Sequence, residues 1–375
     1  MSKPIAAHFV QDYLIATTQW IYGQIRANAE FTPIVLARHK VNPEAFPVDK
    51  LYSMDELPAW RRALDELHLR TRGYSRFFAQ RLQNPSLIHA HFGHIGFKAL
   101  GLARRFNIPL ITSFYGYDVS ALGRNPRYRK RYAQLFAEGN LFLAEGPHLA
   151  NSLVELGCPR EKIRVFHLGV DLIPLDDHIY TTRAADKGAR VLFAATFTEK
   201  KGWADALCAF ARASQQVQMH LRLIGGGEDE AQVIKMIREL GIESLVERSG
   251  YVTHDELLRE MMASDIFLQP SRTAANGNTE GGAPVTLIDA QSVKLAICAT
   301  SHADIPEVAP HGVSSLLSPE GDVELLSENL LRLARDPQLR RQFGENGRAR
   351  VETEYNWSIQ GPRLATIYES CITTR

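Results

Sequence analysis

Short apolar runs alternate with longer segments of helical period along most of the chain. A continuous apolar run bounded by turn residues is typical of a strand buried on both faces. Apolar residues at every third or fourth position are typical of a helix with one buried side. The alternation of these patterns indicates parallel sheets covered by helices. In the first half the predicted strands are Ile5–Val10, Pro33–Ala37, Leu87–His91, Pro109–Ser113, Leu141–Ala144 and Ile163–His167.

The same pattern restarts after a polar interruption. The stretch from Leu172 to Ala189 has no clear period and is predicted to link two domains. Because each half has its own series of strands and helices, we expect two doubly wound α/β domains of similar size. The predicted strands of the second half are Arg190–Ala195, His220–Ile224, Val246–Ser249, Asp265–Leu268, Ala296–Thr300 and Ser314–Leu317.

The domain organisation follows from these boundaries. We expect an N-terminal Rossmann-like domain over 1–173, a linker over 174–189, a C-terminal Rossmann-like domain over 190–356, and a last helix over 357–375 that packs back toward the N-terminal domain. Ligands of such sheets bind beyond the carboxyl ends of the strands. The two domains are therefore expected to face a central cleft that holds the site.

Residues 58–69 have a helical pattern, whereas residues 41–56 are irregular and are predicted to form a loop.

The composition of the chain limits the classes of function that it can have. The chain has 375 residues, more than the roughly 250–300 that one core usually accommodates. A formal net charge of +1 gives no reason to expect nucleic acid as a partner. The four cysteines are widely spaced without a CxxC pair, so we expect no zinc site, no disulfide framework and a reduced cytoplasmic setting. No segment reaches the ~18 apolar residues of a membrane span, and the N-terminal apolar run is too short for a signal peptide.

The stretch from Asn276 to Gln291, NGNTEGGAPVTLIDAQ, combines acids, glycines and a helix start. Pro284 suits the first position of a helix because its missing N–H would have no partner there. Free N–H groups at a helix N-terminus attract anions, and the glycines Gly281 and Gly282 let a phosphate approach closely. With Glu280 before the helix and Asp289 inside it, the stretch is either a diphosphate cradle or an ordinary glycine loop that caps a core helix.

Two turns after predicted strands offer weaker signals. Lys200 and Lys201 precede a glycine and a helix, and at a strand end they would neutralise a phosphate. A lysine pair in a loop is more often simply solvated. The triple glycine that starts at Gly225 does not match a dinucleotide or Walker fingerprint. It is a tight turn that leaves room for a nucleotide.

The N-terminal half carries polar residues near two strand ends. His89, His91 and His94 have spacings that suit a metal, but no acid lies beside them in the sequence, so a polar wall of the cleft is the favoured interpretation. The turn SFYGYDVS offers Tyr115, Tyr117 and Asp118 for hydroxyl recognition, with Asp118 as a helix cap in the alternative.

The segment Gly123–Tyr132 is basic, with interleaved tyrosines. It would suit anionic headgroups or a substrate phosphate, although most such runs are solvated helix faces.

The ordered motifs of the second half resemble those of retaining, nucleotide-sugar-dependent glycosyltransferases of the GT-B fold, family 4. The resemblance covers about Val191 to Ile367, and a looser match (HAHFG, FYGYD and HLGVDL) extends it into the first half. The branch that builds bacterial exopolysaccharide and lipopolysaccharide units is the most similar. The motifs are VLFAATFTEKKG, LRLIGGGED, SGYVTHDEL, DIFLQPS, TEGGAPVTLIDAQ, DIPEVAPHGVSSLLSPEGD and YNW.

The resemblance assigns roles by position. It implies that Glu280 acts at the donor sugar, that Lys201 binds phosphate and that the backbone of Gly282 and Ala283, with the helix after Pro284, holds the diphosphate. The ribose acid falls on Asp289, one residue later than in the E-x7-E pattern.

Other positions depart from the family pattern. The arginine that usually accompanies the lysine falls on Thr196, so Lys200 is the candidate to compensate. A common histidine falls on Tyr115. The usual glycine-rich loop after the first strand is missing, because QDYLIATTQW stands there.

The implied activity is transfer of a hexose from a nucleotide-diphosphate sugar to a saccharide or lipid-linked acceptor, with retention of configuration. His91, Tyr115, Tyr117 and Asp118 are then candidates for the acceptor side. Without a DxD-type metal clamp, positive charge and helix N–H groups must stabilise the leaving diphosphate, so we expect no metal cofactor. The alternatives are a nucleotide-sugar epimerase on the same fold and a non-catalytic nucleotide-sugar-binding partner subunit. Any contact with the inner membrane is expected to be peripheral.

Overall fold

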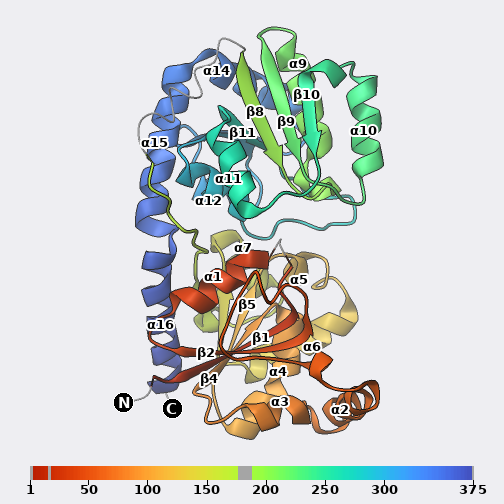
Figure 1. Cartoon of the computed structure of the whole chain (residues 1–375), viewed down its shortest axis with the longest axis vertical. Coiled ribbons are helices and arrows are strands. Elements are labelled where there is room, and N and C mark those ends of the chain that lie inside the picture. The colour runs from red at the N-terminus through yellow and green to blue at the C-terminus, as the bar shows by residue number, and fades with distance from the viewer. Residues whose placement is uncertain (1–2, 16–17, 176–187, 374–375) are drawn as a thin grey trace. The chain divides into compact units, whose positions relative to one another are not determined.

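The computed structural model describes residues 3–15, 18–175 and 188–373. The chain forms two compact units (Figure 1). The first consists of Met1–Gly169 together with Trp357–Arg375, and the second of Val170–Asn356. Each unit is built around its own parallel sheet.

The first unit contains a seven-stranded sheet in the order β3-β2-β1-β4-β5-β6-β7. All its neighbouring strands are parallel. The central strands are apolar throughout because helices cover both faces of the sheet. The strands are β1 (Ile5–Tyr13), β2 (Thr32–Lys40), β3 (Leu51–Ser53), β4 (Leu87–His91), β5 (Leu110–Phe114), β6 (Leu141–Ala144) and β7 (Ile163–Val165).

Helices connect these strands and cover the sheet. Two of them end at residues in the left-handed region, Gly73 after α2 and Asn107 after α4, which stops the helical hydrogen-bond pattern. The helices are α1 (Gln19–Ala27), α2 (Ala59–Arg72), α3 (Arg76–Arg81), α4 (Gly93–Phe106), α5 (Tyr117–Ser120), α6 (Pro126–Glu138) and α7 (Pro147–Glu155), with short 3-10 turns η2 (Met54–Glu56) and η3 (Arg160–Lys162).

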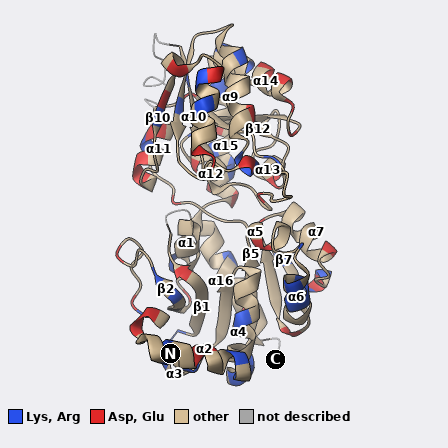
Figure 2. Ribbon diagram, turned by 90° about the vertical axis from the view of Figure 1, so that its right-hand side faces the viewer, with Lys and Arg blue, Asp and Glu red and all other residues tan. Residues whose placement is uncertain are grey.

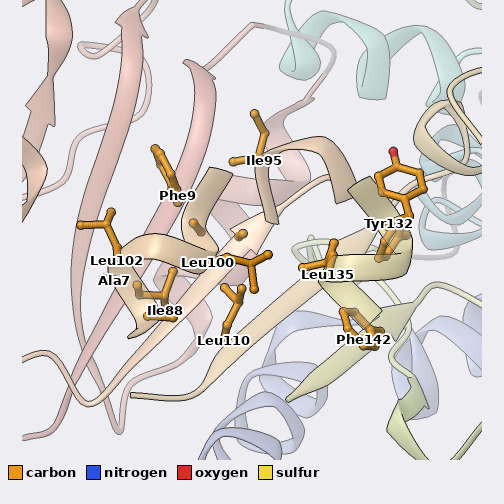
Figure 3. Close-up of a cluster of buried hydrophobic side chains, with 14 of the residues drawn as sticks. Ala7, Phe9, Ile88, Ile95, Leu100, Leu102, Leu110, Tyr132, Leu135 and Phe142 are labelled. Carbon is orange, nitrogen blue, oxygen red and sulfur yellow. The ribbon is translucent and has the colours of Figure 1, made fainter. Parts of the chain in front are cut away.

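One face of this sheet packs against α4 and α6 in a single apolar core (Figure 3). Ile88 and Leu110 come from adjacent strands, Leu100 comes from α4, and Leu135 comes from α6. All four are nearly inaccessible to solvent. Burial of each such side chain contributes about 1.5–3 kcal/mol, so this layer is a main source of the unit's stability.

The last helix, α16 (Trp357–Thr373), belongs to the first unit although it follows the whole second unit in sequence. It packs on α1, where two glycines allow the helices to approach closely. A Cβ at Gly23 would lie 2.3 Å from the Trp357 ring, and one at Gly361 would lie 2.1 Å from the carbonyl oxygen of Ala27.

The second unit contains a six-stranded parallel sheet in the order β10-β9-β8-β11-β12-β13. Its chain runs from β8 outward through β9 to β10 and then returns to the other side of β8 at β11. The gap between β8 and β11 is therefore the topological switch point, where ligands of open α/β sheets bind. The strands are β8 (Ala189–Ala194), β9 (Met219–Ile224), β10 (Val246–Ser249), β11 (Ile266–Gln269), β12 (Ala296–Thr300) and β13 (Ser315–Ser318).

Helices of the second unit connect these strands in turn. The start of α11 is a capping box, in which Thr253 accepts a bond from the Glu256 N–H and Glu256 reaches back to the Thr253 N–H. The helices are α9 (Trp203–Ser214), α10 (Glu230–Glu239), α11 (His254–Met262), α12 (Val285–Ser292), α13 (Ile305–Val308), α14 (Val323–Arg335) and α15 (Pro337–Glu354), with η4 (Glu199–Lys201) and η5 (Glu243–Leu245).

The structure confirms the two doubly wound domains and differs from the sequence prediction in detail. The segment 41–56 is not all loop, because Leu51–Ser53 pairs with β2 at the sheet edge. The first unit ends at Gly169, so residues 170–173 belong to the second unit. Most of the predicted linker, 176–187, lies outside the described residues. Among the described helices, none is long and apolar enough to cross a membrane.

Candidate functional site

A lysine–glutamate pair lies at the switch point of the second sheet. Lys201 follows β8 and Glu280 follows β11, and the Lys201 Nζ lies 2.8 Å from Oε1 and 2.9 Å from Oε2 of Glu280. The Nζ of Lys200 lies 3.4 Å from the same carboxylate. The Glu280 side chain is only 6% exposed. A buried carboxylate is thus matched by two cations from the neighbouring turn.

The charge state of Glu280 follows from these contacts. Burial by itself would raise the pKa of this carboxyl, but the charges of Lys201 and Lys200, the hydrogen bond from Lys201 and nearby His302 lower the pKa to about 2. Glu280 is therefore ionised at neutral pH. Ser271, at the end of β11, also donates a hydrogen bond of 3.0 Å to Oε1.

A second pair, His302 and Glu320, supports the backbone at Glu280. The Nε2 of His302 accepts a hydrogen bond of 3.1 Å from the Glu280 N–H, so the proton of a neutral ring lies on Nδ1. That Nδ1 lies 2.6 Å from Oε1 of Glu320, whose other oxygen accepts a bond from the Thr273 N–H. The carboxylate orients the imidazole, and the imidazole positions Glu280.

The loop after Glu280 presents backbone N–H groups at the start of α12. Gly281 has a φ of +81°, a conformation that a side chain would disfavour. Among the described residues, the N–H groups of Gly281, Gly282 and Ala283 donate no hydrogen bond. The helix begins at Val285, so Pro284 is its N-cap rather than its first residue. The arrangement is suited to binding an anion.

The triple-glycine turn packs against the turn that carries Thr196. Gly225 has a φ of +136°, and a Cβ there would lie 1.9 Å from the carbonyl oxygen of Ala195. The Phe197 N–H donates a bond of 2.7 Å to the carbonyl of Gly226. These contacts explain why glycine is needed at Gly225. Thr196 is half-buried beside them, without the positive charge of an arginine.

Asp289, the candidate ribose ligand, contacts a histidine. Its carboxylate is buried on α12, and the Nε2 of His254 at the start of α11 lies 3.2 Å from Oδ1. Burial alone would lower the pKa of His254, but the hydrogen bond and charge of Asp289, with Asp255 and Asp171, raise it. A ribose hydroxyl at Asp289 would therefore share the carboxylate with His254.

In the first unit the candidate acceptor-side residues differ in exposure. His91 and Asp118 are buried, Tyr115 is 8% exposed and Tyr117 is 49% exposed. The Oδ2 of Asp118 accepts a bond of 2.7 Å from the Gly93 N–H and its Oδ1 accepts one of 3.0 Å from the Tyr115 N–H. Asp118 therefore caps the start of α4, and of these four residues Tyr117 is the most accessible to a ligand.

The histidines of β4 form a buried polar network with a third histidine. His8, His89 and His91 each offer a ring nitrogen within 4.8 Å of the others, whereas His94 is not part of this group. The His8 Nδ1 lies 3.1 Å from the His91 Nε2. Hydroxyl groups make the remaining described contacts. Tyr115 lies 2.7 Å from His91, and Tyr368 and Ser113 lie 2.6 Å and 2.7 Å from the two ring nitrogens of His89.

This network resembles a buried cluster whose hydrogen bonds are already made more than it resembles a metal site. Both ring nitrogens of His89 and both of His91 already have hydrogen-bond partners. A metal ion would have to displace one partner from His89 and one from His91.

The sequence prediction missed Ser271, His302, Glu320 and His254. Each lies just after a strand or at a helix start of the second unit, so the rule that sites gather at strand carboxyl ends was the available signal. None of the four belongs to a spacing pattern that marks a site on its own.

Known proteins resemble both units. The family model described as "Glycosyl transferases group 1" matches residues 178–350, and the one described as "Glycosyltransferase Family 4" matches residues 26–173. The chain is 36% identical over 283 residues to the amylovoran biosynthesis glycosyltransferase AmsK of Erwinia amylovora, which covers 74% of this chain and 69% of the relative. It is 31% identical over 288 residues to an Escherichia coli protein named as a colanic acid biosynthesis glycosyltransferase, WcaL, with coverages of 75% and 70%.

A solved structure agrees over nearly the whole fold. The crystal structure of Anabaena Alr3699/HepE in complex with UDP and glucose aligns with a TM-score of 0.81 at 16% identity, over 97% of this chain and 99% of that chain. The two parallel sheets and the two family matches point to one family. The chain belongs to the family 4 glycosyltransferases of the GT-B fold.

Proposed function

We propose that this protein transfers a hexose from a nucleotide-diphosphate sugar to a saccharide or lipid-linked acceptor, with retention of configuration, in the synthesis of a cell-surface polysaccharide. The observation that carries the proposal is the contact of Lys201 with Glu280 at the switch point, next to unpaired N–H groups at the start of α12. Cations, N–H donors and a carboxylate are the groups that binding and cleaving a sugar diphosphate requires.

Each group has a chemical role in the proposal. The N–H groups of Gly282 and Ala283 bind the diphosphate together with Lys201, whose ammonium group is shared between Glu280 and a phosphate oxygen. Lys200 supplies the second positive charge where Thr196 supplies none. Glu280 faces the donor sugar and stabilises positive charge that develops at its anomeric carbon.

Retention follows in this proposal from attack of the acceptor hydroxyl on the face that the diphosphate leaves. A diphosphate oxygen takes the proton of that hydroxyl. The charge that builds on the leaving diphosphate is balanced by Lys200, Lys201 and the start of α12, so the reaction needs no metal ion. We propose that the protein works in the cytoplasm, where nucleotide sugars are made.

The relatives support the substrate class. AmsK and WcaL are named for the biosynthesis of amylovoran and colanic acid, both in polysaccharide assembly. The Anabaena structure contains UDP and glucose, which supports a nucleotide sugar as the donor. Neither the epimerase nor the non-catalytic alternative is favoured by a relative described above.

The test compares wild type with Glu280→Gln, which keeps the shape of the side chain and removes its charge. A thermal-shift screen over UDP-, GDP- and ADP-sugars first identifies the donor, because a ligand of the folded state raises the midpoint. Release of nucleoside diphosphate is then measured with a cell extract of lipid-linked acceptors. We expect Glu280→Gln to lower turnover by on the order of 100-fold or more.

The control variant is Glu328→Gln, which alters an exposed glutamate of α14. It is expected to keep wild-type turnover. Full turnover in Glu280→Gln would exclude the proposed role of Glu280. Interconversion of the donor sugar without release of nucleoside diphosphate would favour the epimerase.

A further inference from the structure

Helix α2 exposes three large apolar side chains on one face. Trp60 is 61% exposed, Leu64 57% and Leu67 56%. Their spacing of four and three residues places them on one side of a helix. Among the described helices, α2 is the only one with more than one exposed large apolar side chain. We call these three residues the α2 apolar stripe.

The opposite side of α2 is held to the unit by polar contacts. Asp65 is 7% exposed, and its Oδ1 accepts a hydrogen bond of 2.8 Å from the Phe77 N–H at the start of α3. Glu66 pairs with Arg38 of β2, and the Nδ1 of His68 lies 2.9 Å from the carbonyl oxygen of Tyr74. The helix therefore turns polar side chains inward and apolar ones outward, the reverse of an ordinary surface helix.

Arginines border the stripe. The segment 59–81, which contains α2 and the adjacent α3 (Figure 1), has six arginines and two acids. Both acids are engaged by the inward contacts. The exposed residues of α2 include Arg61 and Arg70 on either side of the stripe and no acid. The Arg61 guanidinium lies 4.9 Å from the centre of the Trp60 ring.

The basic helix α6 is different. Figure 2 shows its run of basic residues, of which Arg127, Arg129 and Lys130 are exposed. The tyrosines of the segment turn toward the core, where the fully buried Tyr132 donates a hydrogen bond to the carbonyl of Asp118. Helix α6 thus offers positive charge without an apolar anchor, whereas α2 offers both.

We propose that the face of α2 formed by Trp60, Leu64, Leu67, Arg61 and Arg70 docks on the surface of an anionic phospholipid bilayer. A helix that lies in the plane of the interface inserts its apolar side chains among the upper acyl chains, and tryptophan is favoured at that depth. The flanking arginines then contact lipid phosphates. Pairing of this face with a second copy would bring like charges together, which disfavours that occupant.

The proposal is independent of the donor-site chemistry. It concerns a surface of the first unit, whereas Lys201 and Glu280 belong to the second unit. Vesicle binding therefore tests this proposal separately from turnover.

The experiment is flotation of the full-length protein with vesicles of phosphatidylcholine containing phosphatidylglycerol, and with vesicles of phosphatidylcholine alone. We expect binding to the anionic vesicles that weakens as salt rises. Replacement of the stripe by Trp60→Ser, Leu64→Ser and Leu67→Ser is expected to weaken vesicle binding on the order of tenfold or more. Replacement of Arg61 and Arg70 by serine is expected to weaken it by a similar factor.

The matched control replaces Arg127, Arg129 and Lys130 of α6 by serine, which removes at least as much charge from a basic helix without a stripe. This variant is expected to keep most of the binding. Because all substituted side chains are exposed, each variant should keep the wild-type thermal midpoint and its turnover with a soluble acceptor.

Three outcomes would overturn the proposal. The first is equal vesicle binding by the wild type and the stripe variant. The second is a greater loss of binding in the α6 control than in the stripe variant. The third is a dimer in sedimentation velocity that the stripe variant abolishes while the wild type leaves vesicles unbound, because the stripe would then cover a second copy.

Discussion

At the scale of single residues, Glu280 depends on partners from four separate loops. Lys201 neutralises the carboxylate, Ser271 donates to it, and His302 holds its backbone N–H while Glu320 orients the imidazole. A catalytic group must be held to within a fraction of an ångström to act efficiently. In the proposed mechanism Ser271, His302 and Glu320 hold Glu280 without a role of their own at the donor, and they should therefore affect turnover as well.

We predict that His302→Ala lowers turnover by about 10- to 100-fold, because it removes the acceptor of the Glu280 N–H and releases Glu320. The KM for the donor should change much less, since Lys201 and the start of α12 remain. Steady-state kinetics with varied donor concentration measure both quantities.

His302→Gln should recover part of the lost turnover, because a glutamine amide also accepts and donates hydrogen bonds. His220→Ala, at an exposed position of β9, is the control and should behave as wild type. A fall in turnover of the same size in His302→Gln and His302→Ala, together with a loss of thermal stability, would indicate a structural role instead.

At the scale of elements, the turns after β8 and β9 pack so closely that glycine is required. The Cβ that alanine would add at Gly225 falls 1.9 Å from the carbonyl oxygen of Ala195, and the φ of +136° is outside the range that side chains favour. Gly241 also has a positive φ, of +65°, but nothing lies within 4 Å of its added Cβ. Gly250 has neither constraint.

These three glycines separate backbone strain from steric clash. We predict that Gly225→Ala lowers the free energy of unfolding of the second unit by about 3 kcal/mol or more, because strain and clash add. Gly241→Ala should cost roughly 1 kcal/mol from strain alone, and Gly250→Ala should have little effect. Urea unfolding of each variant measures the differences, and equal values for Gly225→Ala and Gly241→Ala would contradict the argument.

At the scale of the whole molecule, the two units bury different titratable groups. Burial lowers the pKa of His8 to about 3 and, with the neighbouring rings, lowers the pKa of His89 and His91 well below the ordinary value. In the second unit the paired Glu280 has a pKa of about 2. The first unit should therefore be the more sensitive to mild acid.

The direction of this pH dependence follows from how many protons the folded and unfolded states bind. The unfolded chain protonates each histidine near pH 6.5, whereas the folded network keeps the rings neutral, so their stabilisation is present above pH 6.5 and is lost as pH falls below it. Each ring contributes a slope of up to about 1.4 kcal/mol per pH unit. Burial raises the pKa of Asp118 to about 6. Between pH 6 and the unfolded value near 3.9, the contribution of Asp118 therefore stabilises the folded state as pH falls, whereas the contribution of the histidines destabilises it.

Burial also lowers the pKa of His94 to about 4, so four histidines of the first unit take up a proton on unfolding. We predict that the first unit loses stability between pH 6.5 and pH 5, with a net uptake of roughly three protons on unfolding once Asp118 has offset one histidine. Amide hydrogen exchange at several pH values, corrected for the intrinsic exchange rate, measures this unit by unit. The amides of β1 and β4 should lose protection while those of β8 and β12 keep theirs. Constant protection of β1 over this range would contradict the prediction.

The local pattern of the chain was sufficient to predict most of the elements. Strands such as β4 and β12 begin and end where the predicted apolar runs do, because propensity and periodicity are properties of neighbouring residues. The short edge strand β3 was missed, since three residues are too few to establish a period.

What the sequence determined by itself was the set of turns that carry chemistry, including the lysines before α9 and the acid and glycines before α12. The pairing of Lys201 with Glu280, which lies 79 residues further along the chain, depends on the fold, because the order of strands brings β8 beside β11. The fold also places His302 beside Glu280, exposes the apolar side of α2 to solvent and places Tyr368 beside His89. Such contacts depend on the packing of distant segments, which no local pattern encodes.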